Sequence, residues 1–228
     1  MQHFDLVTAI FEFVILIFSL CVHECAHAWT ASRLGDQTAR LQGRVTLNPM
    51  YHVDPIGTLL FPAIMIFGGG FFGLGGFLVG WAKPTPVITR NFRRIVRDDT
   101  LVTLAGPASN LLLALIAFLV LAGLILTAHG HMPDSEVVQK NAEGLGQICF
   151  LAIQINLALF FFNLLPIPPL DGSHVLRHFL PYNLLNYYDR IGMFGLLLMV
   201  VVGGPILGVL LPPAMRLVYF ALQLIQGS

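Results

Sequence analysis

The hydrophobic pattern of the chain consists of long apolar stretches separated by short polar linkers. A bilayer core of about 30 Å requires roughly 20 apolar residues in a helix. Two apolar stretches are irregular, because Ile56 to Trp81 is interrupted by GGGFFGLGG and Arg216 to Gln226 is short. The pattern predicts an all-α, multi-pass membrane protein, a helix bundle whose spans cover about Leu6 to Leu34, Thr100 to Thr127, Gly144 to Leu165 and Ile191 to Leu211.

Charged residues in the linkers predict how these helices are oriented. Two linkers are basic, one after the first span and one before the Thr100 span, so the positive-inside rule places both in the cytoplasm. The acidic linker from Ala128 to Glu143 then lies outside. A single crossing by Ile56 to Trp81 would separate the basic linkers, so this stretch is predicted to be a re-entrant or hairpin element. The basic residues are Arg33, Arg40, Arg44, Lys83, Arg90, Arg93, Arg94 and Arg97.

Composition agrees with a membrane protein, because 56% of the residues are hydrophobic and only 11% are charged. The chain has 12 Lys and Arg residues and 12 Asp and Glu residues, so its formal net charge is zero. This balance gives no support for nucleic acid as a partner. Three cysteines, an odd number in apolar runs, do not form the pattern of a disulfide framework. No soluble segment is evident, and residues 1–228 are expected to form a single membrane-embedded domain.

The first span carries the sequence His23-Glu24-Cys25-Ala26-His27, which matches H-E-x-x-H. Positions i and i+4 of a helix differ by about 40°, so both imidazoles project from one face and can share a metal. Glu24 lies close enough to accept a proton from water at that metal, whereas Cys25 faces away. The match could arise by chance, but three ionisable residues in an apolar span are costly unless they are functional or paired.

A catalytic zinc site needs a third protein ligand and an open position. The best candidate is Asp171 in NLLPIPPLDG, at the inner end of a span and at the same predicted depth as the two histidines. Three prolines would end the helix and leave an extended segment from which Asp171 can turn toward a metal. The alternative is an ordinary cap or turn aspartate before Gly172.

These segments resemble the site-2 protease family of intramembrane metalloproteases. HECAH and NLLPIPPLDG correspond to its two signatures, and Gly106-Pro107-Ala108-Ser109-Asn110 corresponds to its G-x-x-x-N pattern. The resemblance extends over nearly the whole chain, including RVTLNPMYHVDP and GWAKPTPV. It implies a short form without PDZ or CBS domains.

The resemblance also implies roles for individual residues. His23, His27 and Asp171 would bind one Zn²⁺ per chain, and Glu24 would be the general base. Asn163 would lie near the substrate carbonyl, where an amide N–H can stabilise a developing oxyanion.

The remaining polar residues have structural alternatives. A helix-packing hydrogen bond remains the alternative for Asn163, and close helix packing is favoured for Gly106 and Asn110, which share one helix face. For His52, a loop histidine bonded to backbone is favoured over an assisting role in the site. His174 and His178 are interpreted as residues of a helix interface.

The function expected is zinc-dependent cleavage of transmembrane or membrane-proximal segments, at a site toward the cytoplasmic side of the cell membrane. An intact helix hides its amides in hydrogen bonds, so the expected partner within the lipid bilayer is a membrane protein with a locally unwound helix. Thr38 to Leu47 has strand-like character and is a candidate for β-addition to an extended substrate. A non-catalytic zinc scaffold and a transporter remain alternatives, although no internal repeat supports a transporter.

Overall fold

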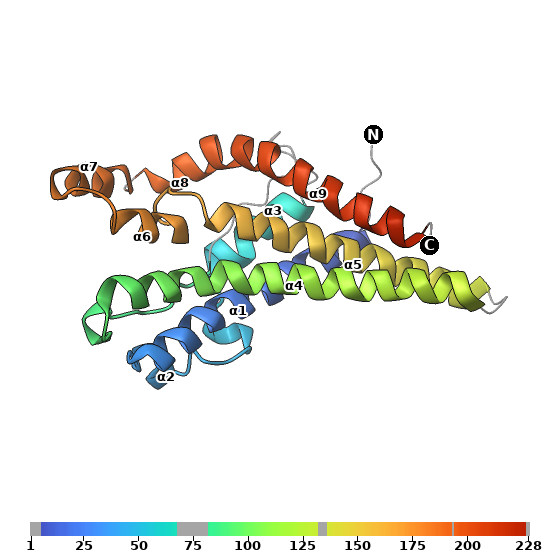
Figure 1. The fold of residues 1–228 in the computed structure, drawn as a ribbon, viewed down its shortest axis with the longest axis horizontal. Coiled ribbons are helices and arrows are strands. Elements are labelled where there is room, and N and C mark those ends of the chain that lie inside the picture. The colour runs from blue at the N-terminus through green and yellow to red at the C-terminus, as the bar shows by residue number, and fades with distance from the viewer. Residues whose placement is uncertain (1–5, 68–81, 132–135, 193, 227–228) are drawn as a thin grey trace.

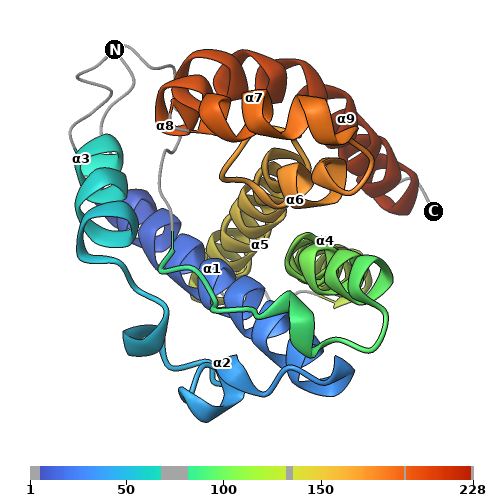
Figure 2. The same cartoon turned by 90° about the vertical axis from the view of Figure 1, so that its left-hand side faces the viewer.

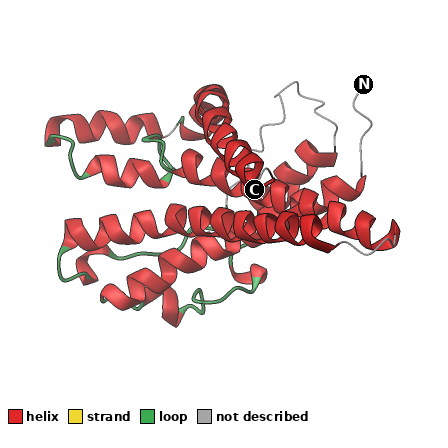
Figure 3. Cartoon of the chain, turned by 45° about the vertical axis from the view of Figure 1, so that its right-hand side comes forward, coloured by secondary structure: helices red, strands yellow, loops and turns green. Residues whose placement is uncertain are grey.

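The computed structural model describes residues 6–67, 82–131, 136–192 and 194–226. Within these ranges every regular element is helical, as Figure 3 shows, and the all-α class is confirmed. Four described helices are long and apolar enough to cross a membrane, so this is a multi-pass membrane protein. The spans are Leu6–Leu34 in α1, Ile95–Thr127 in α4 (Ile95–His131), Asn141–Asn163 in α5 (Glu136–Asn163), and Val201–Gln226, which contains all of α9 (Gly204–Gln226).

The other described elements are short helices and single turns. They are α2 (Thr38–Leu41), a 3-10 turn at Pro49–Tyr51, a π-helical turn at Pro55–Leu60, α3 (Phe61–Phe67), a 3-10 turn at Thr89–Asn91, α6 (Asp171–Arg177), α7 (Tyr182–Gly192), α8 (Gly195–Leu198) and a π-helical turn at Met199–Gly203.

Helix α4 is the longest described helix, and it packs against α1, α5 and α9 (Figure 1). Its apolar contact with α5 and α9 forms the largest buried cluster, which includes Leu121, Ile153 and Met215. Many large apolar side chains elsewhere on the spans are exposed, such as Leu119 and Leu217, as expected where lipid replaces water as the solvent. Figures 1 and 2 place α2, α6, α7 and the start of α4 at the same end of the molecule.

The fourth span differs from its predicted position. The sequence predicted Ile191 to Leu211, but the spanning segment is Val201–Gln226. The predicted span stops at Leu211, directly before Pro212 and Pro213, and proline usually interrupts a helix. Helix α9 instead continues through both prolines, which spanning helices tolerate when neighbouring helices satisfy the freed backbone groups.

Two predictions concerned the chain between α1 and α4. The described part of Ile56 to Trp81 is helical through α3, which packs against α1, and residues 68–81 lie outside the described residues. The strand-like interpretation of Thr38 to Leu47 was wrong. Its first residues form α2, and the N–H groups of Leu41, Gln42 and Arg44 bond to nearby carbonyls, so these groups are not available to a substrate strand.

Candidate metal centre

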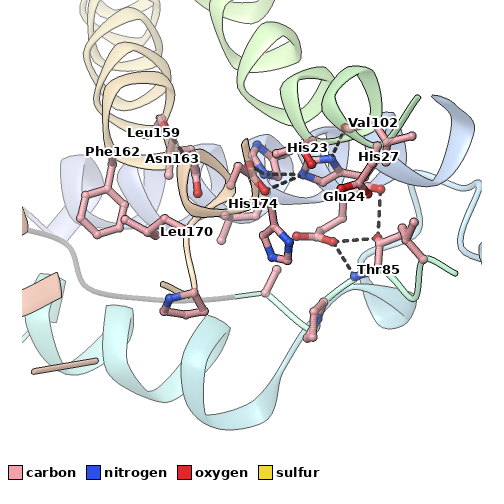
Figure 4. A pocket seen from close by; sticks show the side chains of 18 of the residues that line it. His23, Glu24, His27, Thr85, Val102, Leu159, Phe162, Asn163, Leu170 and His174 are labelled. Carbon is pink, nitrogen blue, oxygen red and sulfur yellow. Dashed lines mark hydrogen bonds and ion pairs between the residues drawn. The ribbon is translucent and has the colours of Figure 1, made fainter. Parts of the chain in front are cut away.

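The two signature segments meet at one point in the fold. His23 and His27 project from α1 with their Nε2 atoms 3.0 Å apart, and Asp171 approaches them from the first turn of α6. One Asp171 oxygen lies 3.1 Å from His23 Nε2, and the other lies 3.4 Å from His27 Nε2. One donor atom from each residue lies within 4.8 Å of the other two (Figure 4 labels the histidines).

Partners of the other ring nitrogens determine the tautomer of both histidines. His27 Nδ1 lies 2.7 Å from the carbonyl oxygen of Val102, which can only accept a hydrogen bond, so Nδ1 carries the proton. His23 Nδ1 lies 2.6 Å from Oδ1 of Asn110, whose amide nitrogen donates to Asn156 Oδ1 at 3.1 Å. In the neutral imidazoles each Nε2 therefore presents a lone pair toward Asp171.

This arrangement of donor atoms fits a divalent metal. With both imidazoles neutral and protonated at Nδ1, two imidazole lone pairs and a carboxylate face one another, and Asp171 Oδ2 is buried without a hydrogen-bond partner. An uncompensated cluster of that kind is costly in an apolar surrounding, whereas nitrogen and oxygen donors of this type are usual zinc ligands. Hydrogen-bond acceptors on the outer ring nitrogens are also typical of metal-binding histidines.

Two glycines permit the close approach of the chain to the cluster. A Cβ on Gly106 of α4 would lie 2.3 Å from His27 Nε2 and 2.6 Å from His23 Nε2, so only glycine leaves this space open. A Cβ on Gly172 would lie 2.2 Å from the carbonyl oxygen of Leu164, which explains why glycine follows Asp171 at the start of α6. The predicted packing role of Gly106 is therefore a role at the metal centre itself.

Glu24 is held by a segment that returns from far along the chain. Its Oε2 accepts hydrogen bonds from the backbone N–H of Thr85 at 3.0 Å and from the Thr85 hydroxyl at 2.7 Å (Figure 4). Thr85 lies in the irregular segment 82–88, which passes beside α1. These bonds fix the direction of the carboxylate.

Asp36, just beyond α1, anchors the end of the same segment. Its carboxylate accepts hydrogen bonds from the Ile88 N–H at 2.7 Å, the Thr38 hydroxyl at 2.5 Å and the Asn91 amide at 2.8 Å. Burial would raise the pKa of Asp36, but these hydrogen bonds favour the carboxylate and bring its pKa below the usual range. The ionised aspartate thereby fixes the path of the segment that reaches Glu24.

A cavity of about 400 Å³ opens beside the cluster. Its wall includes the metal-centre residues, Glu24, Thr85, Asn163 and His174. The Asn163 amide donates to the Leu159 carbonyl at 3.0 Å within its own helix, so the structure shows a helix hydrogen bond on a residue that also faces the cavity. The catalytic role of Asn163 stays a prediction.

His52, His178 and Cys25 lie outside the cluster. His52 Nε2 bonds the Thr46 carbonyl at 2.8 Å, as the backbone alternative predicted. His178 pairs with Asp99 at 2.7 Å between α6 and α4. Cys25 is absent from the donor group formed by the described residues, in agreement with its predicted direction.

Sequence reasoning missed three contributors to the site. Thr85 was noticed only as part of a resembling segment, and Asn156 and Asp99 were not singled out. Asn156 gave a signal, since a buried amide in an apolar span needs a partner. Thr85 gave none, because its contact with Glu24 spans 61 residues and depends on the tertiary path of the loop.

The described chain is a helical membrane protein in which the two histidines of HExxH meet an aspartate from a distant part of the sequence. This is the architecture of an integral-membrane metalloprotease. Comparison with known proteins identifies the family. A profile described as Peptidase family M50 matches residues 11–200. The chain therefore belongs to peptidase family M50, and it is a zinc metalloprotease of the site-2 protease type.

Curated relatives carry the same assignment in their names. The chain is 44% identical over 168 residues to "Putative zinc metalloprotease YwhC" of Bacillus subtilis, a match covering 74% of this chain and 68% of the relative. It is 34% identical to a like-named Rip2 of Mycolicibacterium smegmatis and 35% identical to that of Mycobacterium tuberculosis, over 71% of this chain and 54% of each relative. The chain thus spans about half the length of the Rip2 proteins. No solved structure matches the chain.

Proposed function

We propose that the chain cleaves peptide bonds of membrane proteins within the bilayer or next to it. The main support for this proposal is the position of Glu24, which lines the same cavity as the cluster of His23, His27 and Asp171. This cavity lies near the ends of spanning helices. In the proposed site these three residues hold the metal. Bound zinc supplies a Lewis acid that polarises a carbonyl group and makes water more acidic.

Residues of the chain supply the proton transfers. Glu24 accepts the proton of the attacking water and passes it to the leaving amine, as a general base and then a general acid. Thr85 orients Glu24 through two hydrogen bonds to one carboxylate oxygen, which leaves Oε1 for the water. Asn110 keeps His23 in the tautomer that presents Nε2.

The cavity indicates which substrates can reach the site. About 400 Å³ admits an extended stretch of a few residues, and the amides of an intact helix are engaged in internal hydrogen bonds. The proposed substrate is therefore a membrane segment that unwinds locally. Asn163 is proposed to exchange its bond to Leu159 for the substrate carbonyl oxygen, where it would stabilise developing negative charge.

The proposed orientation places the site toward the cytoplasm. Helices α6 and α7, the start of α4 and α2 lie at one end of the molecule (Figure 1), and most of the basic residues belong to these elements and their linkers. The positive-inside rule favours the cytoplasm for that end. Cysteines introduced at Arg40 or Arg94 would then be labelled only by a reagent on the cytoplasmic side.

The test measures zinc content and cleavage in the same preparations of purified protein in proteoliposomes. The probe is a fluorogenic peptide with an apolar segment interrupted by helix-breaking residues. Glu24→Gln should keep about one zinc per chain and lose roughly 10²-fold or more in rate, whereas Asp171→Ala should lose both. Glu12→Gln, which changes an acid elsewhere on α1, is the matched control and should behave like the parent.

Three results would contradict parts of this proposal. If the parent protein binds zinc but does not cleave a membrane segment with helix-breaking residues, the non-catalytic zinc scaffold would be favoured. A full zinc equivalent in Asp171→Ala would place the third ligand elsewhere. Near-parental cleavage by Glu24→Gln would remove the proton-transfer role of this residue.

A further inference from the structure

Helix α7 is amphipathic and too short to cross a bilayer. Its 11 residues, YNLLNYYDRIG, rise about 16 Å, roughly half of a hydrocarbon core. Polar residues recur on one side at Asn183, Asn186, Asp189 and Arg190, while leucine and tyrosine fill most of the opposite side. The helix therefore has a polar face and an apolar face. It lies beside α6, whose first residue is Asp171 (Figure 2).

One part of the apolar face packs on the loop that leads to Asp171. The Tyr188 hydroxyl donates to the Pro166 carbonyl at 2.9 Å. At the end of α7, a Cβ on Gly192 would lie 3.2 Å from Pro168 Cβ, so helix and loop are in close contact there. The position of α7 consequently determines the position of the proline-rich loop.

The other part of the apolar face is exposed. Leu184 is 45% exposed and Tyr187 is 66% exposed, and the two lie about 60° apart on the helix surface. Phe179 and Tyr182, just before and at the start of α7, are also exposed. We refer to Leu184 and Tyr187 as the apolar flank of α7.

Three features indicate that lipid covers this flank. Exposed apolar residues continue along the chain through Phe194, Leu197 and Val201 into the fourth span, whose surface faces the bilayer. Tyrosine is enriched where a protein surface passes the headgroups, and short amphipathic helices lie in that region with their apolar side buried. Arg190 on the polar side suits anionic headgroups.

We propose that α7 lies in the headgroup region of the bilayer that surrounds the spans, with its apolar flank inserted among the lipids. Through Tyr188 and the Pro166 to Pro169 loop, this contact sets the depth of Asp171 relative to the membrane surface. The lipid contact does not depend on the proposed cleavage reaction, because it follows from exposure and packing alone.

The experiment uses full-length protein in vesicles of phosphatidylcholine and phosphatidylglycerol. Trp29 and Trp81, the two tryptophans of the chain, are first replaced by phenylalanine. A single tryptophan is then placed at Leu184 or Tyr187 on the apolar flank, or at Asn186 on the polar side as the matched control. Leu217→Trp on the exposed surface of α9 is the positive control for a span. Tryptophan emission is compared in lipids brominated near the headgroup and near the chain end.

Tryptophan on the apolar flank should lose roughly half of its emission in lipids brominated near the headgroup, because interfacial helices insert to about 5–10 Å. Chain-end bromine should quench it much less, and Asn186→Trp should be quenched by aqueous iodide instead. The proposal is wrong if bromolipids leave both flank tryptophans unquenched while Leu217→Trp is quenched. Blue-shifted emission without bromolipid quenching would also overturn it, because a protein partner would then cover the flank.

Discussion

Replacing Gly106 by alanine should remove zinc from the protein. The added methyl group would lie 2.3 Å from Nε2 of His27 and 2.6 Å from Nε2 and Cε1 of His23. Ordinary contacts between heavy atoms begin near roughly 3.5 Å, so one of the two helices must move by about 1 Å. Both candidate ligand atoms are the nearest neighbours of the new carbon, and the disturbance falls on the metal centre itself.

The size of the effect follows from coordination geometry. Zinc–imidazole bonds are about 2.0–2.1 Å long, and a displacement of about 1 Å breaks such a bond. Zinc affinity should therefore fall by more than the 10 to 100-fold that is typical when a residue supporting a ligand is changed. Overpacking costs about 1–3 kcal/mol of stability, and the higher helix propensity of alanine offsets only about 0.5–1 kcal/mol of that.

The matched control is Gly123→Ala on the same helix, where a Cβ would meet nothing within 4 Å. Both variants make the same chemical change and gain the same helix propensity, so they differ only in what the methyl group contacts. Zinc content by mass spectrometry, zinc affinity by chelator competition and probe cleavage should be measured for both. Gly123→Ala should match the parent protein in all three.

Two outcomes would refute the reasoning. A Gly106→Ala protein with a full zinc equivalent and near-parental cleavage would mean that α4 does not approach the histidines as closely as the structure places it. Equal loss of zinc in Gly106→Ala and Gly123→Ala would mean that the effect arises from the whole helix and not from the space beside His23 and His27.

The other two predictions concern residues that hold the site in place. Asn110→Ala removes the hydrogen-bond acceptor for His23 Nδ1 and should lower zinc affinity by about 10 to 100-fold. Asn110→Asp keeps an acceptor and should retain most of the affinity in chelator titrations. Equal affinities for the two variants would exclude the role of Asn110 in setting the His23 tautomer. Thr85→Pro removes both hydrogen bonds to Glu24 and should lower kcat by about tenfold or more with zinc retained, since a hydrogen bond to a charged group contributes about 1.5 kcal/mol or more. Thr85→Ser keeps both donors and is the control, and a Thr85→Pro protein with parental kcat would show that Glu24 needs no orientation from this segment.

Periodicity and motif spacing were sufficient to predict the elements that depend on local sequence. The first span was predicted at its observed bounds because a long apolar run in a bilayer has little choice except a helix. The proximity of Asp171 to the two histidines could also be predicted from the sequence. The spans α1 and α5 run in opposite directions, so the inner end of each lies at the same depth in the membrane. The assignment of all three residues as zinc ligands stays a prediction.

Features that depend on tertiary contacts could not be predicted. The predicted fourth span stopped at Leu211, whereas α9 continues through Pro212 and Pro213, and sequence alone does not show which neighbours satisfy the freed carbonyls. Thr38 to Leu47 was predicted to be strand-like, but short-range turn hydrogen bonds determine its conformation. Helix packing was favoured for Gly106 and Asn110, and the structure shows that this packing occurs directly against the candidate ligands.

Helix α4 explains why the chemistry of this site is tied to the fold of the whole bundle. Gly106 and Asn110 are four residues apart, so they lie on one face of α4, one leaving space for the imidazoles and the other bonding His23. Val102, one turn earlier on the same face, supplies the carbonyl that bonds His27. A single helix stripe therefore orients both histidines. A rotation of α4 by even one residue, about 100°, would remove all three contacts together, so packing of α4 against α1 and α5 is a condition for metal binding and not merely for stability.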